Sequence, residues 1–158
     1  MKEVAVNVVT LFFIVAMLAL LIMASGCAPA PRINPPVFRY DNEVVTILSA
    51  DAHARDIGGR TFTLSHTGSM EPMLTGDDRI VVVRVPFSEL KDGEIIVYRA
   101  QWAVNGIPIC HRIVGRDKLG LIMAGDATRH NESGWRVTDA NYIGRVIAVY
   151  RTNKNASN

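Results

Sequence analysis

The stretch that decides the fold is Arg79-Ile80-Val81-Val82-Val83-Arg84-Val85, a β-branched run that ends at Pro86. A second run of the same kind, Glu94 to Arg99 (EIIVYR), follows the turn residues Asp92-Gly93. β-Branched and aromatic residues are enriched in strands, whereas proline and glycine mark where strands end. The two runs therefore predict two strands in the middle of the chain.

Shorter runs on either side extend this pattern. Asn105-Gly106 separates Trp102-Ala103-Val104 from Ile107-Pro108-Ile109, which predicts a two-residue hairpin. The remaining strand-like runs, separated by turn residues, are Arg60 to Ser65, Ile107 to Val114, Leu119 to Ala124 and Ile143 to Tyr150. Many short strands of this kind predict a mainly β fold, an antiparallel β-sandwich or a partly closed barrel.

One helix is expected before the strands, from Asn42 to Arg55. Asn42 is a suitable N-cap, and Gly58-Gly59 ends the segment. The apolar residues Val44, Val45, Ile47 and Leu48 fall on one helical face.

The N-terminus carries a long apolar segment. Val4 to Met23 contains 20 residues without a charge. As a helix this segment is about 30 Å long, which matches the hydrocarbon core of a bilayer. Residues 1–26 therefore predict a transmembrane anchor, or a signal sequence that is removed. Lys2 favours an N-terminus inside the cell, so we expect a single-pass protein whose remaining chain is extracytoplasmic.

The segment after the apolar run has two features of its own. Cys27 follows Ala24-Ser25-Gly26, which resembles a bacterial lipoprotein signal; Cys27 is therefore either a candidate lipidation site or a free thiol. The proline-rich stretch from Ala28 to Pro36 favours an extended spacer. We expect a linker over residues 27–41, one folded domain over residues 42–151 and a frayed tail over residues 152–158.

Composition excludes some function classes. The chain has 158 residues, enough for one domain, and a net charge of +2 without a cluster of Lys or Arg, so nucleic acid is not an expected partner. The histidines and cysteines lack the spacing of metal ligands, and we expect neither a metal nor an organic cofactor.

One stretch contains residues suited to catalysis. It is His66-Thr67-Gly68-Ser69-Met70-Glu71-Pro72-Met73-Leu74, between two predicted strands. A serine hydroxyl becomes an effective nucleophile when a base removes its proton and nearby donors stabilise the oxyanion. Gly68 allows close approach of the backbone, and Pro72 stiffens the exit of the loop. Glycine and serine before a proline are also ordinary loop residues, so the stretch alone does not establish a nucleophile.

This stretch resembles the nucleophile box of the type I signal peptidases, a family of serine peptidases. Three further segments resemble family blocks in the same order, and together the match covers about residues 62–150: Asp92 to Tyr98, His111 to Gly115, and Gly125-Asp126-Ala127 with the later Ile143 to Val146. The histidine at position 111 resembles the archaeal and endoplasmic-reticulum branch of the family, in which a histidine replaces the lysine base.

The resemblance implies a role for each matching residue. Ser69 is the expected nucleophile and His111 its base; Asp126 and Glu132 are both candidates for the acid that orients His111. The Thr67 hydroxyl and the Ser69 main-chain N–H are the expected oxyanion donors.

The function implied is a membrane-bound endopeptidase that cleaves signal peptides from exported preproteins. The 45 residues between Met23 and Ser69 are more than the family usually has, which argues against cleavage at the membrane surface. Two alternatives remain open: a specialised or self-processing peptidase of the same fold, and a non-catalytic lipoprotein that kept the fold.

Overall fold

The computed structural model describes residues 31–100, 106–128 and 134–153. The elements in chain order are β1 (Val37–Tyr40), α2 (Glu43–Asp56), β2 (Arg60–Thr63), β3 (Arg79–Val83), the 3₁₀ turn η1 (Phe87–Glu89), β4 (Ile95–Arg99), β5 (Pro108–Asp117), β6 (Gly120–Ala124) and β7 (Tyr142–Thr152). The predicted mainly β class is confirmed, and all seven strands belong to one sheet.

The sheet is open. Its order is β2-β3-β7-β4-β5-β6, with antiparallel pairs throughout, and β1 joins β7 in parallel. Val149 on β7 pairs with Ile80 of β3 and with Val37 of β1, so β1 lies on the side of β7 away from β3. The described strands form neither two facing sheets nor a closed barrel, contrary to the sandwich or partly closed barrel that the sequence predicts.

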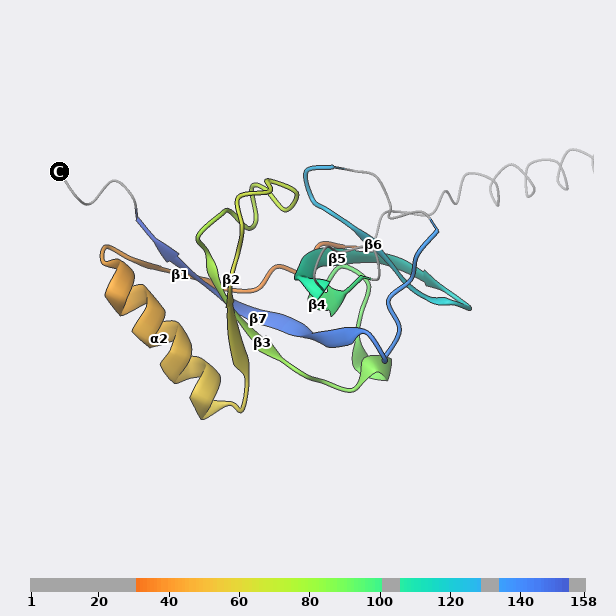
Figure 1. The fold of residues 1–158 in the computed structure, drawn as a ribbon, viewed down its shortest axis with the longest axis horizontal. Helices are drawn as coiled ribbons and strands as arrows, with labels where there is room; N and C mark the ends of the chain where they lie inside the picture. The colour runs from red at the N-terminus through yellow and green to blue at the C-terminus, as the bar shows by residue number, and fades with distance from the viewer. Residues whose placement is uncertain (1–30, 101–105, 129–133, 154–158) are drawn as a thin grey trace, which may run out of the picture.

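Both faces of the sheet are covered because its central strands are apolar on both sides. On β4, Ile95 and Val97 pack into one buried cluster and Ile96 and Tyr98 into another. Figure 1 shows α2 beside β1, β2 and β3 at one end of the molecule, and β4, β5 and β6 at the other end. Non-alternating apolar runs such as EIIVYR are what a strand buried on both faces requires.

The predicted helix is confirmed, and its buried face is not the one that carries the larger apolar residues. The Asn42 side chain accepts a hydrogen bond from Val45 N–H (3.1 Å), as an N-cap does. The helix packs on β3 and β7 through Thr46, Ala50 and Ala54, whereas Val44, Val45 and Leu48 are exposed. Small residues four positions apart let the helix approach the sheet closely, and this contact outweighs the burial of the larger residues.

The predicted hairpin at Asn105-Gly106 is also wrong in register. A two-residue turn there would place Ile109 opposite Trp102 and Pro108 opposite Ala103. Instead Ile109 pairs with Tyr98, and Pro108 with Arg99. In this register the Tyr98 side chain lies in a buried cluster with Ile96 and Ile113. Residues 101–105, which include Asn105 of the predicted turn, lie outside the described residues.

The proline-rich segment belongs to the fold over much of its length. Ile33 N–H donates to Gly93 O (3.0 Å), and Val149 N–H donates to Pro36 O (2.9 Å). Val37–Tyr40, expected as the end of the linker, form β1. The chain lies so close to Gly93 that a Cβ there would come 1.8 Å from Pro31 O. We call residues 31–36 the strap, because they tie the chain onto the sheet before β1 begins.

The predicted anchor over residues 1–26 and most of the tail lie outside the described residues. Within the described part of the chain, no helix has the length and hydropathy needed to cross a bilayer.

Candidate active site

Ser69 lies on the connection between β2 and β3, residues 65–77, which we call the Ser69 loop. Two main-chain hydrogen bonds close its base: Leu64 N–H donates to Asp78 O (2.9 Å), and Asp77 N–H donates to Leu64 O (3.1 Å). Gly68, directly before Ser69, has φ +70°, a conformation that glycine adopts without steric cost. The Ser69 loop is therefore an extension of the β2–β3 hairpin with a fixed base and a turn at the serine.

The expected base lies within hydrogen-bonding distance of the expected nucleophile. His111 is on β5, and its Nε2 is 3.1 Å from Ser69 Oγ. The two residues are 42 positions apart in sequence, and the sheet brings them together. A distance of about 3 Å between heavy atoms is what direct proton transfer requires.

Tyr98 is a partner of His111 that sequence reasoning missed. Its hydroxyl is 3.3 Å from His111 Nδ1. For Nε2 to accept the Ser69 proton, the neutral ring must carry its hydrogen on Nδ1, so in that tautomer the Tyr98 hydroxyl accepts. His111 pairs with Ile96, and Tyr98 is its diagonal neighbour on the same face of β4. The alternation of side chains along β4 places Tyr98 on the same face as Ile96. It identifies Tyr98 as a neighbour of His111 only when the pairing register of β4 and β5 is known.

Asp126 does not contact His111 through any hydrogen bond in the described residues; both of its oxygens bind Arg112. Arg112 Nε donates to Asp126 Oδ1 (2.7 Å) and NH2 donates to Oδ2 (2.6 Å), with side chains only 4% and 3% exposed. A buried guanidinium needs a counter-ion, and the planar fork matches a carboxylate in two places. Of the two acid candidates, Asp126 is therefore paired with Arg112, the residue next to His111 on β5.

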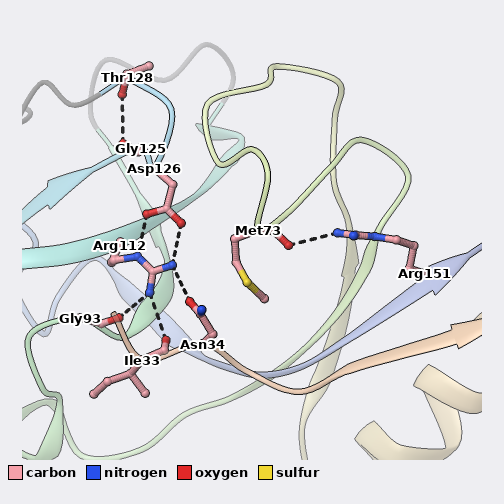
Figure 2. A network of polar contacts seen from close by, with 9 residues as sticks. All are labelled: Ile33, Asn34, Met73, Gly93, Arg112, Gly125, Asp126, Thr128 and Arg151. Atoms are coloured by element: carbon pink, nitrogen blue, oxygen red, sulfur yellow. Dashed lines mark hydrogen bonds and ion pairs between the residues drawn. The ribbon is translucent and has the colours of Figure 1, made fainter. Parts of the chain in front are cut away.

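The residues on either side of Asp126 contact the main chain of Ser69. Ala127 N–H donates to Ser69 O (3.0 Å). A Cβ on Gly125 would come 2.5 Å from the same oxygen, so the turn packs directly against the Ser69 main chain. Arg112 also donates to Gly93 O (2.6 Å), and on the strap to Ile33 O (3.1 Å) and Asn34 Oδ1 (3.0 Å) (Figure 2). One buried arginine thus connects the strap, β5 and the turn behind Ser69.

The predicted oxyanion donors lie beside the nucleophile. Thr67 Oγ1 is 3.3 Å from Ser69 Oγ. The Ser69 N–H makes no hydrogen bond with any residue that the structure describes, which leaves it available for a substrate oxygen. The second acid candidate, Glu132, and the candidate lipidation site, Cys27, lie outside the described residues.

An apolar pocket of about 410 Å³ opens beside Ser69 and His111. None of the described residues that line it is Asp, Glu, Lys or Arg, and its apolar walls include Phe62, Leu64, Leu74, Ile80 and Ile109. The pocket can therefore accept an uncharged, apolar group next to the nucleophile.

Cys110 also lines this pocket. Burial raises the pKa of its thiol to about 12 by desolvating the thiolate. Because the thiolate is the reactive form of cysteine, Cys110 is a poor nucleophile despite its position next to His111. Ser69 is the better candidate of the two.

No three His, Cys, Asp or Glu side chains in residues 31–100, 106–128 and 134–153 are grouped so that they could hold a metal ion.

Comparison of the chain with models of known protein families gives no match, and comparison with curated proteins gives no significant relative. The function is therefore proposed from the geometry of Ser69, His111 and the pocket beside them, together with the resemblance of residues 62–150.

Proposed function

We propose that this chain is a serine endopeptidase of the signal-peptidase type, in which His111 activates Ser69. The observation that carries the proposal is the distance of 3.1 Å between His111 Nε2 and Ser69 Oγ, at the mouth of an uncharged pocket. Under this proposal the open sheet is a variant of the signal-peptidase fold.

The chemistry follows from the arrangement of donors. Neutral His111 takes the proton from Ser69 Oγ as the oxygen attacks the carbonyl carbon of the substrate. The negative charge that develops on the carbonyl oxygen is met by Ser69 N–H and the Thr67 hydroxyl. Protonated His111 then donates its proton to the leaving amine, and water releases the acyl group by the same steps in reverse order.

Two strand edges that are unpaired within the described residues favour a peptide as the substrate. β2 is an end strand of the described sheet, and Phe62 and Thr63 of β2, with Leu64 and Ser65 directly after it, line the pocket. On β5, the pairing with β6 begins at Arg112, so within the described residues Pro108 to His111 pair only with β4. An extended peptide that enters the pocket can hydrogen-bond to such edges, which is a general mode of peptide recognition.

The pocket also bears on substrate class. Its apolar walls favour uncharged side chains before the cleaved bond. The resemblance implies that those at the first and third positions are small. Exported preproteins carry such residues. The strap brings the chain into the fold beside Arg112, one residue from His111. The chain between Met23 and the strap is then only seven residues long, so the length of the sequence before Ser69 does not argue against cleavage close to a membrane.

Cleavage of a reporter preprotein by the purified full-length chain in detergent tests the proposal. We expect the wild type to cut the reporter and Ser69→Ala to leave it intact, with both proteins showing the same circular dichroism and melting temperature. Equal processing by the two proteins would contradict it. Failure of the folded wild type both to cut any preprotein and to react with a fluorophosphonate would instead support the non-catalytic alternative.

A further inference from the structure

Arg151, at the end of β7, contacts the side of the Ser69 loop away from Ala127. Its Nε donates to Asp78 Oδ1 (2.7 Å) and its NH2 to Asp78 Oδ2 (2.5 Å). The same NH2 donates to Met73 O (3.1 Å), as Figure 2 shows. The Asp78 side chain is 1% exposed and that of Arg151 is 17% exposed, so the pair is largely removed from water.

Asp78 carries this contact into the loop. Its Oδ2 also accepts a hydrogen bond from Thr75 N–H (2.8 Å). One guanidinium therefore fixes main-chain groups at both Met73 and Thr75, through one direct contact and one carboxylate. The planar guanidinium of Arg151 donates from two nitrogens to the Asp78 carboxylate and from one of them to Met73 O. The contact therefore restrains direction as well as distance.

The contact reaches the nucleophile through a single turn. Glu71 N–H donates to Gly68 O (3.1 Å), and Leu74 N–H donates to Met70 O (3.0 Å), so the main chain between Gly68 and Leu74 is coiled on itself. Ser69 is held on one side by Ala127 and is four residues from Met73 on the other. A shift of Met73 therefore moves Ser69 relative to His111, which is on a different strand.

We propose that Arg151 is a positioning residue, which fixes the Ser69 loop through Asp78 and Met73 so that Ser69 Oγ stays within reach of His111. This proposal rests on the proposed peptidase function. Displacement of a reacting group by about 1 Å lowers a rate by about 100-fold, so a contact that restrains the loop from outside the site can have a large effect on catalysis.

The test compares Arg151→Met with a matched control, Arg84→Met. Arg84 makes the same kinds of contact, with one carboxylate (Asp139) and two main-chain carbonyls (Tyr142 O, 2.5 Å, and Asp139 O, 3.3 Å), but it does not contact the Ser69 loop. Full-length proteins are compared below their melting temperatures. The readouts are the rate of Ser69 labelling by a fluorophosphonate, and kcat and KM on a preprotein reporter.

We expect Arg151→Met to lower the labelling rate and kcat by about 10- to 100-fold with little change in KM. Arg151→Lys keeps the charge without the planar fork and should recover part of the loss. Arg84→Met should lower the melting temperature but label at the wild-type rate. Equal labelling of folded Arg151→Met and wild type, or equal losses in Arg151→Met and Arg84→Met, would overturn the proposal.

If Arg151→Met does not fold, Arg151→Lys and Asp78→Asn are compared with Arg84→Met in its place. The proposal then requires both to label more slowly than wild type while folded, and wild-type rates in both would overturn it. A wild type that is not labelled at all would instead overturn the peptidase function, so the two failures give different results.

Discussion

Two regions of the molecule, the contact of α2 with the sheet and the surroundings of Ser69, are held together by different interactions. The buried contacts of α2 are mostly small and apolar: Ala50 and Ala54 pack against Val81 and Ala148, with one partly exposed pair, Arg79–Asp51, beside them. Around Ser69, two buried arginine–aspartate pairs, Arg112–Asp126 and Arg151–Asp78, hold the loops. Apolar packing tolerates small shifts, whereas bidentate charged hydrogen bonds fix direction and distance. The difference indicates that geometry matters most around Ser69.

The largest effect expected from this comparison is that of Arg112→Met. The substitution leaves the Asp126 carboxylate buried without its counter-ion, which typically costs about 3–5 kcal/mol of stability. It also frees the turn behind Ser69, so activity should fall in the molecules that remain folded. Urea unfolding monitored by circular dichroism and the labelling rate of Ser69 measure the two effects.

The double variant Arg112→Met with Asp126→Leu sharpens this prediction. Removal of both charges should recover much of the stability, because no unpaired charge remains buried, but it should not recover activity. Full activity in the stable double variant would show that the pair contributes to folding alone.

A smaller effect on stability is expected in the α2 region, for Asn42→Ala. Loss of the N-cap should lower the free energy of unfolding by about 1 kcal/mol, because Val45 N–H loses its acceptor. The labelling rate of Ser69 should not change. A drop in the labelling rate as large as that of Arg112→Met would contradict the distinction between the α2 region and the surroundings of Ser69.

The smallest effect is expected for Asp51→Asn, and the difference from wild type should shrink further in acid. The hydrogen bond from Arg79, helped by that from Thr61, holds the pKa of Asp51 below its ordinary value. A lowered pKa contributes stability above the unfolded value of about 3.9, and that stability is lost as the pH falls through the folded value. The unfolding free energy of Asp51→Asn should therefore depend less on pH below about pH 4 than that of wild type. Identical pH dependence in the two proteins would contradict the prediction.

Local signals in the sequence predicted local structure well. Asn42 marked the start of α2, and the β-branched runs marked β3 and β4, because capping and strand propensity act over a few residues. The Ser69–His111 pair was predicted only through the resemblance, because the contact depends on the order of strands.

The features that the sequence did not predict depend on which side chains contact one another in the folded chain. Asp126 was a candidate to orient His111, but its carboxylate pairs with the buried guanidinium of Arg112, which needs a counter-ion. The exposed faces of Val44 and Leu48 followed from close packing by alanines, which hydropathy alone does not favour. The docking of Asn34 on Arg112 joins residues 78 positions apart and carries no local signal.

The most direct test of the central claim is to locate and time the reaction of the full-length protein with a fluorophosphonate. We predict one modified peptide, with the label on Ser69, and a labelling rate that falls by about 100-fold or more in His111→Ala. Iodoacetamide should leave Cys110 unmodified under the same conditions, because its raised pKa keeps the thiol protonated. A label on another residue, or an equal rate in wild type and His111→Ala, would contradict the assignment of Ser69 and His111 as nucleophile and base.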